Sequence, residues 1–442
     1  MPSVLWLRRD LRVRDNPALL AALDDGPVTA LFVIDPVIWS GAGPARRAWL
    51  AANVLELAGR IPLTIRHGDP ADVVSAVAAD VGAAAVHIAA ETTPYGRRRD
   101  AAVGELVDLV ATGSAYAVGP GLITNKTGEP YQVFSAFARA WRDRGWSRPA
   151  STPRSPDLAE ADSDPEALAL LERAVADAPF DLPTPGEDAA WRRWHAFRAE
   201  GLDAYRVERD RPDHDGTSRL SPYLHLGVLH PRSLLADLDP ASTYATELAW
   251  REFYADVLWH TPSSAWSDLK PALSGMRYDE PDDAIEAIDA WRTGTTGFPI
   301  VDAGMRQLLA TGWMHNRVRM ITASFLTKDL HVWWPSGARH FLSLLIDGDV
   351  ASNNHGWQWV AGTGTDASPY FRVFNPVTQG KKFDPDGSYV RRWVPELAHL
   401  VGAAAHEPWQ SDVGYQGGYP LRIVDHAHER LEALERYRAA RA

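Results

Sequence analysis

Residues 28–35, VTALFVID, form an almost continuous apolar run of strand length. Runs of this kind are typical of parallel strands. Three similar runs occur at 4–7 (VLWL), 63–69 (LTIRHGD) and 84–90 (AAVHIAA), with amphipathic stretches between them. This alternation predicts an α/β domain with a doubly wound parallel sheet over residues 1–125. Ligands of such sheets bind beyond the carboxyl ends of the strands.

The remainder of the pattern predicts a connector and a second domain. The stretches 46–61, 71–82 and 97–110 carry the helical periodicity that the crossovers of the first domain require. Within 126–190 the chain becomes rich in Pro, Asp, Ser and Ala, which indicates an interdomain connector. Over 191–442 the patterns are helical almost throughout, between Gly and Pro breaks, so we expect an all-α domain.

Composition narrows the class of protein. With 442 residues, 45% of them hydrophobic, the chain is long enough for two domains with full cores. No stretch approaches the ~20 apolar residues of a membrane span, and the start MPSVLWLRRD lacks the order of a secretion signal. We therefore expect a cytoplasmic protein without membrane contact. The absence of cysteine excludes disulfides, thiolate metal sites and cysteine nucleophiles. The histidines show no metal-ligand spacing, so no metal is expected.

The net charge of −12 argues against a protein that coats nucleic acid indiscriminately. One basic face could still bind DNA. The doublets Lys381-Lys382 and Arg391-Arg392 could supply such a face by binding phosphates. The alternative is that these side chains are simply solvated.

The segment Asp347–Trp359, DGDVASNNHGWQW, combines two carboxylates, two side-chain amides and two indoles. If it is mostly helical, Asn353 and Trp357 stand four residues apart and share a face. An amide and a redox-capable ring could then meet one planar ligand. The alternative is a buried Trp pair whose indole N–H groups bind neighbouring Asn and Asp side chains.

Hydroxyl and amide groups gather in the run Gly216-Thr-Ser-Arg-Leu-Ser221, at a predicted helix start. Hydroxyl donors, free N–H groups and the positive end of a helix dipole suit a phosphate. The alternative is an ordinary N-cap formed by Thr217 or Ser221. Tyr205, twelve residues before Thr217, could lie over the same ligand.

In ELAWREF, helical spacing places Glu247, Trp250 and Arg251 on one face. A flat ring could stack on Trp250 while Glu247 bonds its polar edge. The alternative is a surface ion pair between Glu247 and Arg251.

In WMHNRVRM, the residues Asn316, Arg319 and Met320 fall at steps of three and four on a helix. Arg319 has apolar neighbours and should need a carboxylate partner, for which Asp347 and Asp349 are candidates. We predict an ion pair between Arg319 and Asp347.

Together these motifs resemble the DNA photolyase and cryptochrome family from end to end, and most closely the class I cyclobutane pyrimidine dimer photolyases. The stretches that carry the resemblance follow in the family's order: WLRRDLRVRDNPAL, GTSRLSPYL, ELAWREFY, GFPIVDAGMRQL, GWMHNRVRMITASF, LIDGDVASNNHGWQW and YVRRWVPEL.

The resemblance implies an FAD in the helical domain, with phosphates near the 217–221 loop and Asn353 facing N5 of the flavin. A side-chain amide at that position suits a photolyase, whereas plant cryptochromes have an aspartate there. The implied cofactor-binding residues are Tyr205, Thr217, Ser218, Arg219, Leu220, Ser221, Arg251, Arg319, Asp347, Gly348, Asp349 and Asn353.

The implied reaction is light-driven repair of pyrimidine dimers in UV-damaged DNA, by electron transfer from excited reduced FAD to a dimer flipped out of the duplex. Glu247 would hydrogen-bond the dimer radical anion. Met320 stands where enzymes for the (6-4) lesion carry a histidine-containing motif. The implied lesion-binding and DNA-binding residues are Arg209, Glu247, Trp250, Asn316, Arg317, Met320 and Trp359.

Family members reduce oxidised flavin through a tryptophan chain, and Trp357 and Trp334 match its first two members. The implied catalytic residues are therefore Glu247, Asn353, Trp357 and Trp334. The third tryptophan does not transfer, because this chain has Pro281 there, with Tyr278 the nearest aromatic residue. Photoreduction could end on a tyrosine, take another route or be slow.

An antenna chromophore in the first domain is also implied by the resemblance. Arg46 and the stretch 91–100, ETTPYGRRRD, resemble members that use a deazaflavin rather than a folate. An empty antenna site is the alternative. We expect a monomer.

Two competing functions are a cryptochrome-like blue-light photoreceptor and a flavin oxidoreductase that uses a nicotinamide cofactor. The oxidoreductase would need a dinucleotide fingerprint, and Gly41-Ala-Gly43 does not directly follow a strand and has Arg46 where a small residue belongs.

Overall fold

The computed structural model describes residues 1–159, 162–270, 273, 275–280, 282, 284–365 and 371–441. Its contacts group the chain into two compact units, each with a hydrophobic core of its own. The first unit comprises Met1–Glu200, Ser218–Pro262 and Ile346–Ala351, and the second comprises Gly201–Thr217, Ser263–Leu345 and Ser352–Ala442. Within the described residues, no helix is long and apolar enough to cross a membrane.

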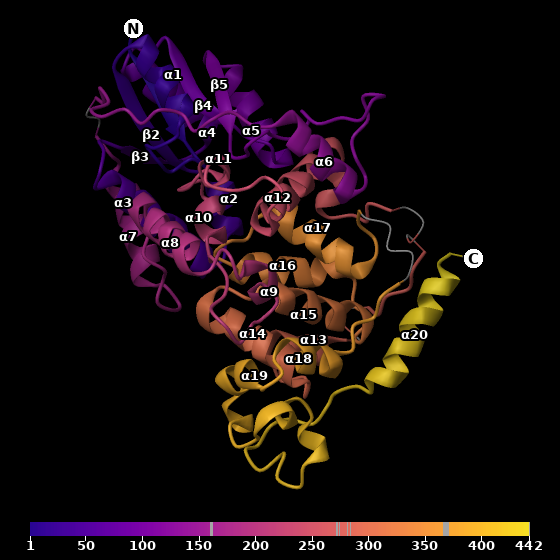
Figure 1. Cartoon of the computed structure of the whole chain (residues 1–442). Coiled ribbons are helices and arrows are strands. Elements are labelled where there is room, and N and C mark those ends of the chain that lie inside the picture. The colour runs from indigo at the N-terminus through magenta and orange to yellow at the C-terminus, as the bar shows by residue number, and fades with distance from the viewer. Residues whose placement is uncertain are drawn as a thin grey trace. The chain divides into compact units, whose positions relative to one another are not determined.

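The first unit contains a parallel sheet with the strand order β3-β2-β1-β4-β5 (Figure 1). The prediction that the four apolar runs form strands is confirmed by β1, β2, β3 and β4. The fifth strand was not predicted, because the helical periodicity over residues 97–110 predicts a single helix there, which is wrong. The helix α5 ends at Gly104 and a strand begins at Leu109. The strands are β1 (Ser3–Leu7), β2 (Val28–Ile34), β3 (Thr64–His67), β4 (Ala85–Ala90) and β5 (Leu109–Ser114).

The sheet is doubly wound. The crossover from β1 to β2 and the crossover from β3 to β4 run in opposite directions across it. Because parallel crossovers are right-handed, their helices α1 and α4 cover opposite faces. The strand order reverses between β1 and β4, so the ligand-binding switch point of this fold lies beyond the carboxyl ends of those two strands.

Side-chain N-caps define where the crossover helices α1 and α4 begin. The Asn16 side chain accepts from Leu19 N before α1, and Asp69 accepts from Ala71 N before α4. In both helices a proline follows the cap, where its missing N–H costs nothing. The helices of this unit are α1 (Pro17–Asp25), α2 (Pro36–Gly41), α3 (Pro44–Ala58), α4 (Pro70–Asp80), α5 (Pro94–Gly104), α6 (Phe134–Arg144), α7 (Pro165–Ala176), α8 (Glu187–Glu200), α10 (Ser221–His225), α11 (Pro231–Leu235) and α12 (Thr243–His260).

The described residues of the second unit form helices and loops without a strand, which agrees with the helical C-terminal region that the periodicity predicted. The helix α17 begins in the last segment of the first unit and continues here, and η1 also crosses a boundary. The helical elements are α9 (Tyr205–Glu208), η1 (Pro262–Ala265), α13 (Ile285–Thr293), α14 (Pro299–Thr311), α15 (Asn316–Lys328), α16 (Trp334–Leu344), α17 (Val350–Ala361), α18 (Pro376–Phe383), α19 (Ser388–Trp393), η3 (Pro395–Leu397), η4 (Gly402–His406), η5 (Pro408–Gln410) and α20 (His426–Ala439).

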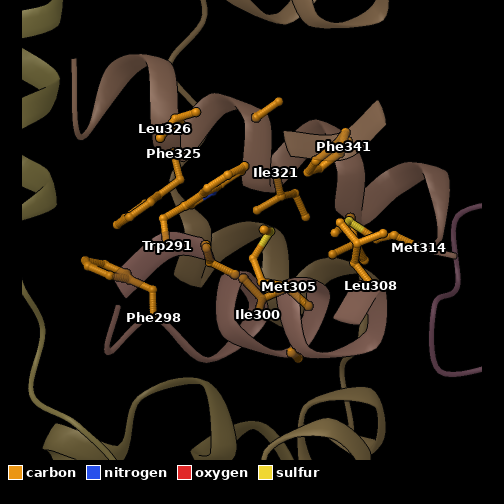
Figure 2. Close-up of a cluster of buried hydrophobic side chains, with 14 of the residues drawn as sticks. Trp291, Phe298, Ile300, Met305, Leu308, Met314, Ile321, Phe325, Leu326 and Phe341 are labelled. Atoms are coloured by element: carbon orange, nitrogen blue, oxygen red, sulfur yellow. The ribbon is translucent and has the colours of Figure 1, made fainter. Parts of the chain in front are cut away.

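Large aromatic side chains fill the core of the helical unit. Figure 2 shows Trp291, Phe298 and Phe325 within this cluster, and each is at most 1% exposed. Glycine allows α14 to approach α15 closely, because a Cβ at Gly304 would stand 2.4 Å from Val318 Cγ1. Dense packing of this kind fixes the position of each ring, which matters for the indoles of the candidate site.

Candidate functional site

The two carboxylates that precede α17 are held by partners far away in the sequence. Asp347 accepts a hydrogen bond of 2.6 Å from Ser221 Oγ, at the start of α10. Asp349 accepts one of 2.9 Å from the Arg9 guanidinium, just after β1. Both carboxylates are buried, and charge-assisted bonds of this length hold them firmly.

Arg9 lies beyond the carboxyl end of β1, at the switch point of the sheet. It also pairs with Glu91, just beyond the end of β4, at 3.5 Å. Burial alone would lower the pKa of Arg9, yet Glu91, Tyr116 and Asp349 together raise it. Arg9 therefore keeps its charge inside the protein. Arg9 was not predicted as a site residue, although it falls in the motif WLRRDLRVRDNPAL.

A second cation stands near the same carboxylates. Burial lowers the pKa of Arg46, and the charges of Asp349 and Asp347 counteract that shift. Burial also lowers the pKa of His225 well below its usual range, and Arg9 and Arg46 lower it further, so the ring is neutral. The result is a cluster of two half-buried guanidinium groups and two buried carboxylates, which could receive the phosphates and hydroxyls of a nucleotide cofactor.

The loop before α10 has no side-chain cap at its helix start. The N-cap position is Leu220, so neither Thr217 nor Ser221 plays the capping role considered above. Ser218 Oγ lies 2.8 Å from the Tyr244 hydroxyl. Arg219 has a φ of 50°, a left-handed conformation that costs a non-glycine residue about 1 kcal/mol or more. Such strain is typical of ligand-binding loops.

On α12, Trp250 stacks against Phe134 of α6, with ring centroids 3.5 Å apart and planes inclined by 9°. Arg251 has different neighbours, since it donates to Ala115 O at 2.8 Å and to Leu224 O at 3.2 Å. The convergence of Glu247, Trp250 and Arg251 on one ligand stays a prediction. The contact with Phe134 was missed because no local spacing reports it.

The prediction that Asn353 and Trp357 share a helix is confirmed by α17. Asn353 Nδ2 donates to Ala338 O at 3.1 Å and to Asn354 Oδ1 at 2.8 Å. With both amide protons engaged, the amide oxygen is the polar atom left to meet a ligand. Trp357 is 3% exposed and packs directly on Gly337 of α16.

Trp334 begins α16, and its Nε1 donates to Asp268 Oδ1 at 2.7 Å. In the alternative considered for the Asp347–Trp359 segment, its own Asn and Asp side chains would bind indole N–H groups. Instead, the side-chain amide of Asn353 donates to Ala338 O and Asn354 Oδ1, and the side-chain amide of Asn354 donates to Ala265 O. The indoles of Trp333 and Trp334 both donate to a carboxylate outside this segment, that of Asp268.

The structure brings some of the predicted DNA-binding residues together beside α15. Arg317 pairs with Asp210 at 2.8 Å, and the Arg209 guanidinium lies 5.8 Å from the ring centroid of Tyr205. Asn316 is exposed in the first turn of the helix, while Met320 and Trp359 are half-buried and pack against the core of the second unit.

Arg319 Nε donates to Met314 O at 2.8 Å. The Arg319 to Asp347 ion pair stays a prediction. Pro281, the position where the family's third tryptophan is expected, lies outside the described residues.

Two members of the basic doublets already have partners. Lys381 pairs with Glu407, and Arg391 donates to Asp386 O at 2.7 Å. Lys382 and Arg392 are exposed. Among the residues that the structure describes, there is no group of three or more His, Cys, Asp or Glu side chains that could hold a metal ion.

The chain matches the family model for the FAD binding domain of DNA photolyase over residues 244–439 and the model for DNA photolyase over residues 3–157. It is 40% identical to the deoxyribodipyrimidine photo-lyase of Halobacterium salinarum, over 99% of each chain.

Solved structures show the same likeness. A bacterial class III photolyase from Agrobacterium tumefaciens is 34% identical, with a TM-score of 0.88 and coverage of 99% of this chain and 97% of that one. A cryptochrome from Synechocystis is 27% identical, with a TM-score of 0.88 over 98% and 99%. An archaeal photolyase from Sulfolobus tokodaii, solved with two FAD molecules, is 27% identical, with a TM-score of 0.85 over 99% and 100%.

Proposed function

Because the chain belongs to the DNA photolyase family, we propose that it repairs cyclobutane pyrimidine dimers in DNA by light-driven electron transfer from reduced FAD. When bound, the flavin supplies the electron that splits the dimer and takes it back afterwards. The residues of the chain bind the cofactor, present the lesion to it and exclude water.

The donor set fits this cofactor. The Ser218 and Ser221 hydroxyls and the cations near Asp349 suit a diphosphate, and the Asp347 and Asp349 carboxylates suit hydroxyls and ring N–H groups. The other proposed cofactor contacts are those that the resemblance implies: Tyr205, Thr217, Arg219, Leu220, Arg251, Arg319, Gly348 and Asn353.

The Asn353 amide carries most of this proposal. Its Nδ2 protons are committed to Ala338 O and Asn354 Oδ1, so its oxygen can only accept a hydrogen bond. An acceptor complements the N5–H group of a reduced flavin and does not complement the bare N5 of an oxidised one. The arrangement therefore supports a protein that works with reduced flavin, which favours repair over light sensing.

For the lesion, we assign Trp250 as a stacking platform. Phe134 covers one face of its indole and holds the ring in a single orientation, so ordering it on binding costs little entropy. Base stacking on such a ring is worth about 1–3 kcal/mol per base. Glu247, on the same helix, is assigned to hydrogen-bond the dimer. Asn316 and Met320 on α15, with Trp359 on α17, are assigned to the remaining contacts.

The decisive test is repair of a defined oligonucleotide that carries one pyrimidine dimer, using chemically reduced protein in blue light against a dark control. A (6-4) oligonucleotide is assayed in parallel. We expect light-dependent repair of the dimer alone. The variant Trp250→Ala should weaken binding of damaged DNA, whereas Trp250→Phe, which keeps a stacking ring, should retain most of it.

The alternative function is a cryptochrome-like photoreceptor, and the likeness to the Synechocystis cryptochrome is the observation that favours it. Absence of repair of either lesion, by protein shown to hold reduced FAD, would support that alternative and count against ours.

We also propose a deazaflavin as the antenna chromophore. Arg46 interacts with the Asp349 and Asp347 charges of the candidate FAD site, so it is not counted as support for an antenna site. The support for a deazaflavin comes from the stretch 91–100. Chromophores released by mild denaturation and separated by chromatography would identify the antenna, and a second FAD or a folate would overturn the assignment.

A further inference from the structure

Two adjacent indoles at the start of α16 share one carboxylate oxygen. Trp334 Nε1 donates to Asp268 Oδ1 at 2.7 Å, and Trp333 Nε1 donates to the same atom at 3.3 Å. The ring centroids lie 6.3 Å apart and the planes are inclined by 68°. Trp334 is 0% exposed, whereas Trp333 is 38% exposed. The pair therefore joins a buried indole to an indole that reaches solvent.

The buried member of this pair begins the helix against which Trp357 packs. A Cβ at Gly337, three residues after Trp334 on α16, would stand 2.2 Å from Trp357 Cη2. Trp357 in turn lies one helical turn after Asn353 on α17. Trp357 thus packs on the first turn of α16, the helix that Trp334 begins, and Trp334 shares the carboxylate of Asp268 with the exposed Trp333.

We propose that Trp333 is the terminal electron donor for photoreduction of the flavin, in place of the tryptophan that Pro281 replaces. This inference rests on the proposed FAD function. One electron moves from Trp357 to the light-excited oxidised flavin, Trp334 refills Trp357, and Trp333 refills Trp334. The oxidised Trp333 indole loses its Nε1 proton to Asp268 or to solvent. A small-molecule thiol in solution then returns one electron and one proton to it.

Other aromatic residues nearby are less suited to this role. The Tyr278 hydroxyl is buried without a hydrogen-bond partner among the described residues. Burial raises the pKa of Tyr278, and the negative charge of Asp268 raises it further. Oxidised tyrosine must release a proton, so it needs the acceptor that this hydroxyl lacks. Trp291 contacts Trp357 edge-on at 6.0 Å, but it is 1% exposed and lies inside the core shown in Figure 2. The Trp291 ring itself therefore does not meet solvent.

Trp266 is as exposed as Trp333, at 37%, and differs from it in the sign of its charged neighbour. The Arg339 guanidinium lies 4.8 Å from the Trp266 ring centroid, so removing an electron from that ring places positive charge beside positive charge. The Asp268 carboxylate has the opposite effect on Trp333, because it stabilises the cation that forms there.

The test compares Trp333→Phe with Trp266→Phe and Tyr278→Phe in the FAD-loaded protein, which is oxidised and then illuminated with a thiol present. We expect Trp333→Phe to slow the loss of the oxidised flavin's visible absorption several-fold and to shorten the lifetime of the transient tryptophan radical. The other two variants should match the wild type. Asp268→Asn should prolong the radical cation, because the proton acceptor is gone.

A second measurement does not depend on DNA repair or on the rate of photoreduction. Illumination in air without thiol should leave covalent oxygen on residue 333 of the wild type, and peptide mass spectrometry would locate it. Photoreduction by Trp333→Phe at the wild-type rate, or its loss in Tyr278→Phe, would overturn the proposal. Repair by chemically reduced wild type bypasses photoreduction, so failure of the proposed function would be seen there separately.

Discussion

Replacing Gly337 by alanine should destabilise the helical unit, although alanine favours helices. The exchange gains about 1 kcal/mol in helix propensity. The new Cβ would stand 2.2 Å from Trp357 Cη2 and 2.6 Å from Leu326 Cδ2, in a fully packed core. Overpacking of this kind costs about 1–3 kcal/mol, and distances this short place Gly337 at the upper end. We therefore expect a net loss of about 2 kcal/mol.

A double-mutant cycle isolates the cause. Trp357→Phe removes the indole atoms that meet the new Cβ, so the cost of Gly337→Ala should fall by about 1–2 kcal/mol in that background. Gly356→Ala on α17 is the propensity control, because no atom lies within 4 Å of its added Cβ, and it should stabilise the protein by up to about 1 kcal/mol.

Urea unfolding followed by near-UV circular dichroism measures all four proteins of the cycle and the control. Additive effects of the two substitutions, or a Gly337→Ala variant as stable as Gly356→Ala, would refute the packing argument.

Three further predictions concern charge. Burial lowers the pKa of Lys328 from 10.5 to about 7, so between those pH values the unfolded chain holds a proton that the folded protein lacks. The free energy of unfolding should then rise by about 1.4 kcal/mol per pH unit over that window. Lys328→Met should abolish this rise. A difference in stability between the two proteins that does not change with pH, as measured by urea unfolding, would contradict the prediction. Arg392→Ala should make the slope of log affinity against log salt concentration shallower by about 0.9, for damaged and undamaged DNA alike. Fluorescence anisotropy measures this slope. An unchanged slope would show that Arg392 does not contact a DNA phosphate. Asn353→Asp should lower the midpoint potential of the bound flavin, because a carboxylate repels the anionic reduced form; spectroelectrochemistry that gives the wild-type value would speak against contact of residue 353 with the flavin.

The fold was largely predictable because its strands and helices differ in periodicity. The runs at β1 and β2 are continuous and apolar, as expected of strands buried on both faces. The edge strand β3 is buried at Thr64 and Ile65, and β4 is buried over its first four residues. The strand β5 is a half-buried edge strand whose first residues, Leu109 and Val110, continue the apolar positions of the preceding helix. Periodicity alone does not separate the end of one from the start of the other.

The candidate site was predictable only where its residues are close in sequence. Spacing along α17 gave the shared face of Asn353 and Trp357. Arg9 and Asp349 are separated by 340 positions, so no local pattern connects them. A signal did exist for Arg9, since a charged residue beyond the carboxyl end of β1 stands where doubly wound sheets bind ligands.

The tryptophans of the helical unit show why residue type alone does not assign a function. Trp291, Trp266 and Trp333 share the same ring, but Trp291 donates to Thr322 O inside the core, Trp266 lies under a guanidinium, and Trp333 donates to Asp268 at the surface. Only the last combines exposure with a neighbouring negative charge. Because an indole is oxidised most easily where the resulting positive charge is stabilised and its proton can leave, the partner of each ring decides which one can exchange electrons with solvent. A sequence gives the positions of all 18 tryptophans, and folding assigns their partners.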